Sequence, residues 1–492
     1  MRRSTRVALV GLQSSPASTT AKSGGRPSSP ELAVFDKLGS LGVVGEGLDR
    51  LIPSNWARNV AFTARRYHAP TSVEELCDLV HSSPKVRVIG ARHSFSTIAD
   101  SDGDLVTLEH LPSVLELDPE ARAVTVSAAT TVADLAEHLH ANGWALHTLP
   151  GHADITVAGA LATAAHGSGD AQGCLLTALV AAEYVDADGS LVCCCGSMPS
   201  ASLGQTMTED LQGVLLGGLG VVVEVTLAIE AAYDARVDTF GPVPWGRLSE
   251  LWGINQIFAD AYAVSLFIND FTSDAGAAQV WFKRRVPTTG PLFVGSIYAG
   301  SVLGPAGKTS QHGRGSDQII GLYSADKAPA LPPQPDELFD APRAVAASHP
   351  IPGLDPLRDC YPQGEPPGPW HLRLPHFQVA PWPASDRQGY IQSEYFVPRD
   401  DAVGVIEGLR GFGPTLAPVL KCCELRTVGT RHLRVHGHVV QCATWTWSWN
   451  MRLALTLVSA VRAFLVALPF HLTSLSTCTA HSNPACGCVS SL

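Results

Sequence analysis

Short apolar runs alternate with polar turns along residues 55–230, and their spacing predicts both helices and strands. Leu76, Leu79 and Val80 recur at helical spacing, and Ser72 followed by Glu75 is typical of a helix N-terminal cap. The pattern also predicts a helix over residues 132–140. Apolar runs bounded by turn residues predict strands over residues 85–90, 105–108, 123–126 and 221–229. Together these elements predict an α+β domain that ends near residue 230.

A second structured region follows. It has a predicted helix over residues 245–261 and a predicted strand over 263–268. Residues 287–335 are rich in Gly, Pro, Ser and Lys and show little periodicity, so we interpret them as an insertion or long loop. Regular patterning returns at residue 336 and continues to about 428. Beyond residue 430 it fades, and we expect residues 430–492 to be poorly ordered.

The two ends of the chain leave localisation open. Residues 1–30 hold five Arg or Lys and many Ser but no acidic residue, which fits an organellar transit peptide and equally a disordered tail. The chain could therefore be organellar or cytoplasmic. Residues 453–472 are mostly apolar and barely reach the length of a membrane helix. Arg462 near the middle of that run disfavours spanning, and a buried helix is the preferred interpretation.

Composition narrows the function classes. The 492 residues are 45% hydrophobic and 16% charged, which excludes disorder over most of the length. The 34 Lys and Arg against 45 Asp and Glu give a formal charge of −11, so no broad basic surface favours nucleic acid. The 12 cysteines form no CxxC pair, which argues against a zinc site and a disulfide scaffold. The balance is typical of an enzyme that acts on small molecules.

Four short segments carry the candidate chemistry, and three of them combine glycine with small or polar residues. Glycine lets the backbone approach a ligand closely, and turn amides can cradle phosphate oxygens. Any one of these loops alone is more typical of an ordinary turn. The common nucleotide, zinc-protease and serine-hydrolase fingerprints (GxGxxG opening a helix, GxxxxGK[ST], HExxH and GxSxG) do not occur. The segments are residues 90–95, 155–170, 216–222 and 423–427.

His93 and the Glu424–Arg426 pair are the most informative side chains. His93 lies on a turn directly after a predicted strand, where an imidazole nitrogen could attach to a flavin. Glu424 and Arg426 stand two apart on a predicted strand and therefore share one face. A carboxylate accepts hydrogen bonds from hydroxyl groups, and a guanidinium donates them and stabilises a developing alkoxide. Without further evidence, a surface or interface ion pair explains Glu424 and Arg426 better.

Several motifs together resemble the vanillyl-alcohol oxidase type of FAD enzymes. Within that group they resemble most the alditol and xylitol oxidases, relatives of the gulonolactone and arabinono-lactone oxidases. The resemblance extends over roughly residues 55–430 except 287–335, and it reverses the preference for a mere ion pair. The matching segments include Asn55-Trp56-Ala57-Arg58-Asn59, Gly90-Ala91-Arg92-His93-Ser94-Phe95, residues 155–169, Gln279-Val280-Trp281-Phe282-Lys283, residues 368–377, Gln392-Ser393-Glu394-Tyr395-Phe396 and Glu424-Leu425-Arg426-Thr427-Val428.

The resemblance implies an α+β fold with two functional domains. A two-subdomain, PCMH-type FAD-binding domain would cover residues 55–232, and a cap domain with a large antiparallel sheet would cover 233–430. Residues 1–50 and 431–492 would be an N-terminal tail and a divergent C-terminal tail. His93 matches the histidine that bonds covalently to the flavin, and Glu424 and Arg426 match the catalytic pair. The implied FAD-lining residues are Ile89, Gly90, Ala91, Arg92, Ser94, Phe95, Val157, Gly159, Thr163, His166, Gly167, Ser168, Gly169 and Val222.

The chain also departs from the family pattern. Gly151 stands where the family has a serine that approaches the substrate. Residues 444–447, Thr-Trp-Thr-Trp, are the nearest match to a His-x-Thr strand, but neither threonine is preceded by that histidine. No lysine follows Lys421, although the family has an active-site lysine near its C terminus. These departures suggest a truncated or frame-shifted gene model and weak activity.

We therefore expect FAD-dependent oxidation of a polyol such as xylitol or sorbitol. Hydride would pass to flavin N5, and O2 would be the electron acceptor and would give H2O2. Two alternatives remain open at this point. One is an aldonolactone oxidase acting on D-arabinono- or L-gulono-1,4-lactone, and the other is a flavin-binding protein with an incomplete active site. No metal or nucleic-acid partner is expected, and membrane association is disfavoured but left open through residues 453–472.

Overall fold

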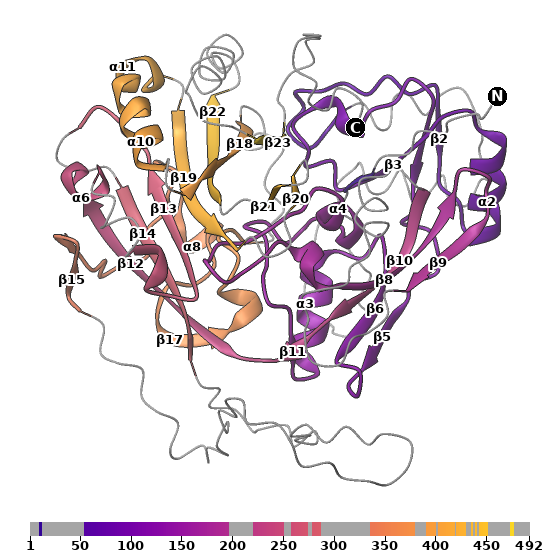
Figure 1. The fold of residues 1–492 in the computed structure, drawn as a ribbon, viewed down its shortest axis with the longest axis horizontal. Coiled ribbons are helices and arrows are strands. Elements are labelled where there is room, and N and C mark those ends of the chain that lie inside the picture. The colour runs from indigo at the N-terminus through magenta and orange to yellow at the C-terminus, as the bar shows by residue number, and fades with distance from the viewer. Residues whose placement is uncertain are drawn as a thin grey trace, which may run out of the picture.

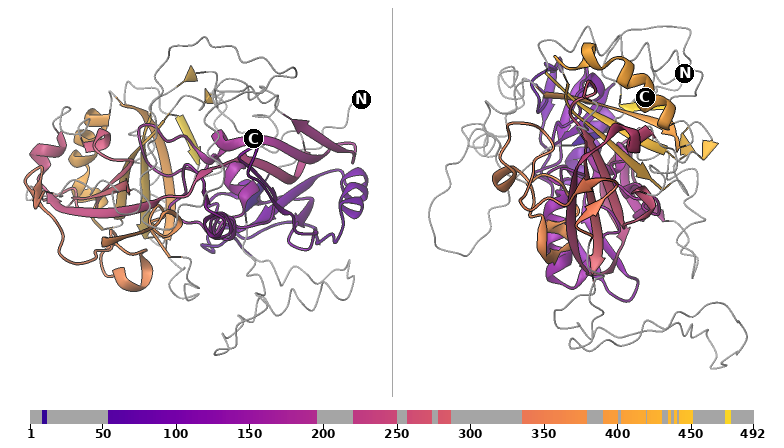
Figure 2. Two further views of the ribbon diagram at one scale, coloured as in Figure 1. Left: turned by 90° about the horizontal axis from the view of Figure 1, so that it is seen from below. Right: turned by 90° about the vertical axis from the view of Figure 1, so that its left-hand side faces the viewer.

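The computed structural model describes residues 9–11, 54–195, 220–249, 257–273, 278–286, 335–378, 390–399, 402–418, 420–429, 434–435, 438–439, 442–450 and 473–476. Most of the expected tail at 1–50, nearly all of the expected insertion at 287–335 and the apolar run at 453–472 lie outside these residues. Two groups of strands lie side by side, one built mainly from the N-terminal half and one from the C-terminal half (Figures 1 and 2).

The first group contains a parallel sheet and an antiparallel sheet. The parallel sheet has the order β1-β3-β4-β2, and the antiparallel sheet has the order β5-β6-β10-β8-β9. The strands are β1 (Leu9–Gly11), β2 (Arg66–His68), β3 (Val86–Gly90), β4 (Asp104–Thr107), β5 (Leu115–Asp118), β6 (Ala123–Ser127), β8 (Leu179–Asp186), β9 (Leu191–Cys195) and β10 (Gly220–Ala228). A two-stranded ribbon of β7 (Trp144–Ala145) and β11 (Glu230–Ala231) lies beside them.

Three helices accompany these sheets, α2 (Val73–Ser82), α3 (Val132–Ala141) and the short α4 (Val157–Ala162). The side chain of Ser72 accepts a hydrogen bond from the backbone N–H of Glu75, which confirms the predicted cap of α2. Leu76 and Val80 of α2 are buried in the core that α3 also enters with Leu135 and Leu139. The helical periodicity therefore marks the faces that pack on the sheets.

The second group is one eight-stranded antiparallel sheet with the order β17-β12-β14-β13-β19-β22-β18-β23. Its strands are β12 (Asp234–Val243), β13 (Ala263–Ile268), β14 (Ala278–Val286), β17 (Gly364–Pro369), β18 (Tyr390–Pro398), β19 (Leu420–Val428), β22 (Cys442–Asn450) and β23 (Thr473–Ser476). Three smaller pieces, the hairpins β15 (Glu337–Leu338) with β16 (Ala341–Pro342) and β20 (Arg434–Val435) with β21 (His438–Val439), and helix α8 (Pro356–Asp359), complete this half.

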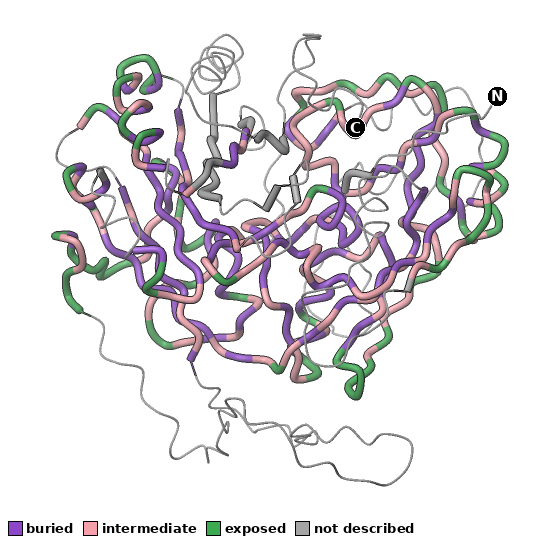
Figure 3. Tube along the Cα trace, viewed as in Figure 1, coloured by how far each residue is buried: buried purple, intermediate pink, exposed green. Residues whose placement is uncertain are grey.

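The two faces of the large sheet differ in chemistry. Helices α6 (Trp245–Ser249), α10 (Ala402–Gly411) and α11 (Gly413–Leu416) cover the face farthest from the first group, over an apolar core that includes Leu266 and Leu425 (Figure 1). Side chains alternate along a strand, so the neighbouring residues Ser265 and Arg426 belong to the opposite face. Figure 3 shows buried segments in both halves, including β13 in the large sheet and α4 in the first group, whereas α2 lies at the exposed rim.

Two details differ from the expectations. Of the helix expected over residues 245–261, residues 245–249 form α6 and residues 257–259 are also helical, while residues 250–256 lie outside the described residues. The chain bends at Asp260 and Ala261, just before β13 begins at Ala263. Within the stretch expected to be poorly ordered, residues 442–450 form β22, which pairs with both β19 and β18. Long-range pairing, rather than a local pattern, gives β22 its place in the sheet.

Candidate active site

Glu424 and Arg426 lie on the polar face of β19, since Leu425 between them is buried under the helices. Their side chains are 12% and 9% exposed, so both charges are largely removed from solvent. Glu424 Oε2 and Arg426 Nη1 are 3.9 Å apart, too far for a hydrogen bond. The two groups therefore attract each other without consuming each other's hydrogen-bonding capacity.

Glu394 of β18 is the stronger partner of the guanidinium. Arg426 Nη2 donates to Glu394 Oε1 at 2.8 Å, and His166 Nε2 lies 3.2 Å from the same oxygen. Burial alone would raise the pKa of Glu394, but Arg426 and His166 hold it well below its usual range. Burial likewise opposes the charge of Arg426, yet Glu424 and Glu394 raise the pKa of Arg426. The sequence motif contains Glu394, but its approach to Arg426 was missed because the two lie in different strands.

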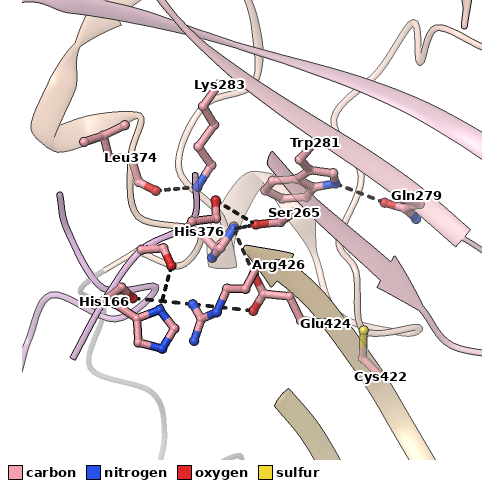
Figure 4. Close-up of polar contacts among 12 residues, drawn as sticks. His166, Ser265, Gln279, Trp281, Lys283, Leu374, His376, Cys422, Glu424 and Arg426 are labelled. Atoms are coloured by element: carbon pink, nitrogen blue, oxygen red, sulfur yellow. Dashed lines mark hydrogen bonds and ion pairs between the residues drawn. The ribbon is translucent and has the colours of Figure 1, made fainter. Parts of the chain in front are cut away.

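His376 reaches the same face from the loop after η5 (Trp370–Leu372). Its Nε2 lies 3.1 Å from Ser265 Oγ and 3.6 Å from Glu424 Oε1 (Figure 4). Burial, reinforced by the charges of Lys283 and Arg426, lowers the pKa of His376 well below its usual value. The imidazole is therefore neutral at neutral pH. Among the described residues, Glu424 Oε1 makes no hydrogen bond and keeps acceptor capacity for a hydroxyl group.

Lys283 of β14 is a second site residue without a predicted role. Its side chain is buried, and its Nζ donates to the backbone carbonyl of Leu374 (Figure 4). Burial is the main reason that the pKa of Lys283 falls to about 7, against the opposing influence of Glu424. The only sequence signal was its position inside the motif Gln279-Val280-Trp281-Phe282-Lys283.

The His93 loop is held in a defined position by the preceding motif. Asn55 Nδ2 donates to the carbonyl of Ser94 at 2.8 Å, and Asn59 Nδ2 donates to the carbonyl of Phe95 at 2.8 Å. The His93 ring stacks on Trp56 with centroids 4.8 Å apart, and its Nε2 lies 3.8 Å from Asp154 Oδ2. The motif at residues 55–59 therefore positions the loop that carries His93.

A series of aromatic rings extends from His93 toward the second sheet. His93 and His152 have centroids 6.1 Å apart, and His152 stacks on Phe377 at 4.9 Å. Burial lowers the pKa of His152, while the charges of Asp154 and Glu424 oppose that shift. His152 thus lies within electrostatic reach of both Asp154, beside His93, and the predicted catalytic glutamate.

The predicted glycine loop after α4 meets the large sheet directly. Gly169 donates its backbone N–H to the carbonyl of Thr427 at 2.8 Å, and Ser168 Oγ lies 3.4 Å from Ser265 Oγ. Arg426 Nη1 lies 3.5 Å from the carbonyl oxygen of His166. The fold therefore brings residues 166–169 from the first half of the chain against β19 from the second half.

The other predicted FAD-lining residues have mixed environments. Val157 and Gly159 are buried within α4, and Thr163 is exposed and donates to the carbonyl of Gly159 at 3.0 Å. Gly167 donates its N–H to Thr148 Oγ1 at 3.1 Å. Val222 is fully buried in the core of the antiparallel sheet. The roles in binding FAD remain predictions for Ile89, Gly90, Ala91, Arg92, Ser94, Phe95 and these residues.

The departures from the family pattern have structural counterparts. A Cβ atom at Gly151 would lie 3.0 Å from His376 Nδ1, so a serine there would crowd the imidazole. In the register of the sheet, Thr446 pairs with Glu424 and Thr444 pairs with Arg426. The threonine pair is therefore beside the predicted catalytic pair along the backbone, as a strand following Glu-x-Arg should be.

Two properties of the described residues bear on other functions. Within them, no cluster of three or more His, Cys, Asp or Glu side chains is arranged to hold a metal ion. None of the helices in the same part of the chain has the length and apolarity to cross a membrane. The apolar run at residues 453–472 lies outside the described residues.

Comparison with known proteins decides the family. Residues 64–194 match the FAD binding domain family. The chain is 35% identical over 378 residues to an alditol oxidase from a Streptomyces species, covering 76% of each protein. The chain belongs to the alditol oxidase family. It is an FAD-dependent oxidoreductase that acts on CH–OH groups, and the resemblance expected from the motifs is confirmed.

More distant relatives agree with this placement. L-gulonolactone oxidase from Bos taurus is 34% identical over 190 residues, which cover 38% of this chain and 42% of that protein. D-arabinono-1,4-lactone oxidase from Eremothecium gossypii is 28% identical over 202 residues, or 39% and 37% of the two chains. A solved solvent-stable cholesterol oxidase has a TM-score of 0.56 at 15% identity, covering 86% and 85%, and shows the shared fold.

Proposed function

We propose that this oxidoreductase oxidises a polyol, an alditol such as xylitol or sorbitol, with O2 as acceptor and H2O2 as product. The supporting observation is the buried Glu424–Arg426 pair, which faces the 166–169 loop in a chain that alditol oxidase matches over 76% of its length. The lactone oxidase match extends over only 38%, which favours an alditol over a lactone. We assign residues 55–232 to a PCMH-type FAD-binding domain and 233–430 to a substrate cap of sugar-lactone oxidase type.

The residues present fit FAD. His93 is 16% exposed on a loop held by Asn55 and Asn59, so its imidazole is presented in one orientation. We propose that it bonds covalently to the 8α carbon of the flavin, and that residues 89–95, 157–169 and Val222 hold the rest of the cofactor. When bound, FAD supplies the redox chemistry, acceptance of hydride at N5 followed by reduction of O2.

The protein's own groups bind and polarise the alcohol. Arg426 donates to the oxygen of the reacting CH–OH group and stabilises its developing negative charge, because a buried guanidinium acts strongly where water is excluded. Glu424 Oε1, which makes no hydrogen bond among the described residues, accepts from a substrate hydroxyl. Glu394 fixes the guanidinium at 2.8 Å and is a positioning residue.

Anaerobic mixing of the purified flavoprotein with xylitol, sorbitol, gulono-1,4-lactone and arabinono-1,4-lactone tests this function. We expect the polyols to bleach the flavin absorbance and oxygen to restore it with release of H2O2. Faster bleaching by a lactone would instead identify an aldonolactone oxidase. Bound flavin that bleaches with neither class would identify a flavin-binding protein with an incomplete active site.

Arg426→Ala provides the residue-specific test. Removal of one stabilising donor should cut kcat/KM by about 10²–10³-fold while FAD stays bound. Arg343→Ala is the matched control, because Arg343 forms a largely exposed ion pair with Asp336 at 3.1 Å. Full activity in Arg426→Ala, or loss of its flavin, would show that the pair serves structure rather than catalysis.

A further inference from the structure

The environment of Lys283 joins it to the catalytic pair. Lys283 is 2% exposed and stands in register with Val237 of β12 and Ala263 of β13. Its ammonium donates to the carbonyl of Leu374, two residues before His376. His376 in turn lies 3.1 Å from Ser265 Oγ and 3.6 Å from Glu424 Oε1. Lys283 therefore fixes the backbone segment that carries the imidazole to Glu424.

The charges around Lys283 define what its own charge does. Glu424 and Arg426 face it from β19, and Cys360 and His376 face it from the segments after α8 and η5. Burial raises the pKa of Cys360 to about 12, and burial keeps His376 neutral, so neither contributes charge near neutral pH. With Glu394, the cluster holds two carboxylates. Arg426 and His166 lie against Glu394, and the ammonium of Lys283 acts on Glu424.

We propose that Lys283 is a positioning residue for alcohol oxidation: its amino group holds the His376 segment, and turnover depends on its positive charge, which offsets the charge of Glu424. The inference rests on the proposed function. Without that charge, Glu424 loses a positive neighbour, and the more negative cluster opposes the negative charge that develops on the substrate oxygen. A neutral amine still donates to Leu374, so the effect is electrostatic and reaches the site through Glu424 and His376.

The direction of the pH dependence follows from burial. Burial lowers the pKa of Lys283 to about 7, so the side chain is charged below that pH and neutral above it. We expect kcat/KM for a polyol to fall as the pH rises through about 7. In the unfolded chain the lysine keeps its proton up to its ordinary pKa of 10.5. Between about pH 7 and 10 the wild type should therefore gain stability relative to a variant without the lysine.

The experiment compares pH profiles of kcat/KM for the wild-type holoenzyme, Lys283→Met, Lys283→Arg and the control Lys85→Met. Lys85 is a partly exposed lysine that pairs with Asp102 on the surface. Lys283→Met should lose at least about tenfold in kcat/KM at pH 6 and show no fall near pH 7. Lys283→Arg stays charged and should keep its activity from pH 6 to 9, and Lys85→Met should match the wild type.

Thermal unfolding at pH 6, 8 and 10 provides a readout that needs no substrate. The difference in Tm between Lys283→Met and the wild type should shift in favour of the wild type as the pH rises. A Tm difference that stays constant with pH overturns the inference but not the proposed function. So does a kcat/KM profile of Lys283→Met or Lys283→Arg that still falls near pH 7 as the wild type does. If Lys283→Met does not fold, the pH profile of kcat/KM for Lys283→Arg provides the kinetic test. A wild type that turns over no polyol or lactone at any pH overturns the proposed function and this inference with it.

Discussion

At the residue scale, His93 combines a reactive imidazole with a constrained setting. Trp56 stacks on one side of the ring at 4.8 Å, and Asp154 lies 3.8 Å from Nε2. A flavin bonded there should stay with the chain after denaturation in SDS or acid, and His93→Ala should release it. Fluorescence of the denatured protein band measures this. His81→Ala, an exposed histidine of α2, should retain the flavin. Complete release of flavin from the wild type would contradict the covalent bond.

Glu394 links catalysis to stability at the same scale. Arg426 and His166 lower the pKa of this carboxyl below that of the unfolded chain, near 4.5, so its ion pair stabilises the fold above that pH. The stabilisation should be lost as the pH falls below about 4.5, because the unfolded chain then takes up the proton first. Glu394→Gln should lower the free energy of unfolding at pH 7 by about 1–3 kcal/mol.

Urea titrations of the Glu394→Gln variant at pH 7 and pH 4 measure both effects. The gap between wild type and variant should be larger at pH 7 and should narrow at pH 4. Asp340→Asn is a suitable control, because Asp340 pairs with Arg247 at the surface, where solvent screens the interaction. An equal difference in the free energy of unfolding at both pH values would mean that Arg426 and His166 do not lower the pKa of Glu394.

At the scale of elements, the bridge between the 166–169 loop and β19 decides whether the site forms. Gly169 has φ +133° and pairs with Val428, and a Cβ there would clash with the carbonyl of Tyr262. Gly169→Ala should cost roughly 1–3 kcal/mol and lower kcat/KM, since the loop must leave the strand. Thermal unfolding and steady-state assays check both. Gly411→Ala at the end of α10 is the control: an added Cβ there would meet no neighbouring atom within 4 Å, so stability and kcat/KM should not change. A Gly169→Ala variant as stable and active as the wild type would exclude a tight bridge.

The elements also show which features a sequence can predict. Ser72 with Glu75, and the apolar repeat that follows, are local signals, and α2 begins where they predict. Glu424 and Arg426 share a face because side chains alternate along any strand. By contrast, Glu394 meets Arg426 only because β18 and β19 both pair with β22. The sequence of β22 has no pattern that indicates which strands it pairs with. Lys283 had no predicted role for the same reason, because Leu374 and Glu424, which it approaches, belong to distant parts of the chain.

At the scale of the whole molecule, an aromatic and charged cluster connects the two halves that build the site. Arg285 of β14 lies over the rings of Tyr233 and Tyr262, with its guanidinium carbon 3.7 and 3.9 Å from their centroids. The same guanidinium pairs with Glu230 at the end of the first half, with Nη1 to Oε2 at 3.0 Å. Cation–π contacts are worth about 0.5–1 kcal/mol at exposed sites and about 2 kcal/mol when desolvated, and the Arg285 side chain, 31% exposed, lies between these cases. The relative position of His93 and Glu424 therefore depends on contacts outside the site.

The large sheet provides the second whole-molecule constraint, because β22 lies between β19, which carries Glu424 and Arg426, and β18, which carries Glu394. A chain that ends after Gly429 lacks β22, so β18 and β19 would have no common neighbour and the 2.8 Å contact between Glu394 and Arg426 would be lost. The flavin of such a chain should not be bleached by any polyol, and limited proteolysis should cut its large sheet more readily than that of the full chain. Separate quantification of bound flavin would show whether the first half still holds FAD. A shortened chain with wild-type kcat/KM would contradict a central role for β22. It would mean that β19 and the 166–169 loop are sufficient for catalysis.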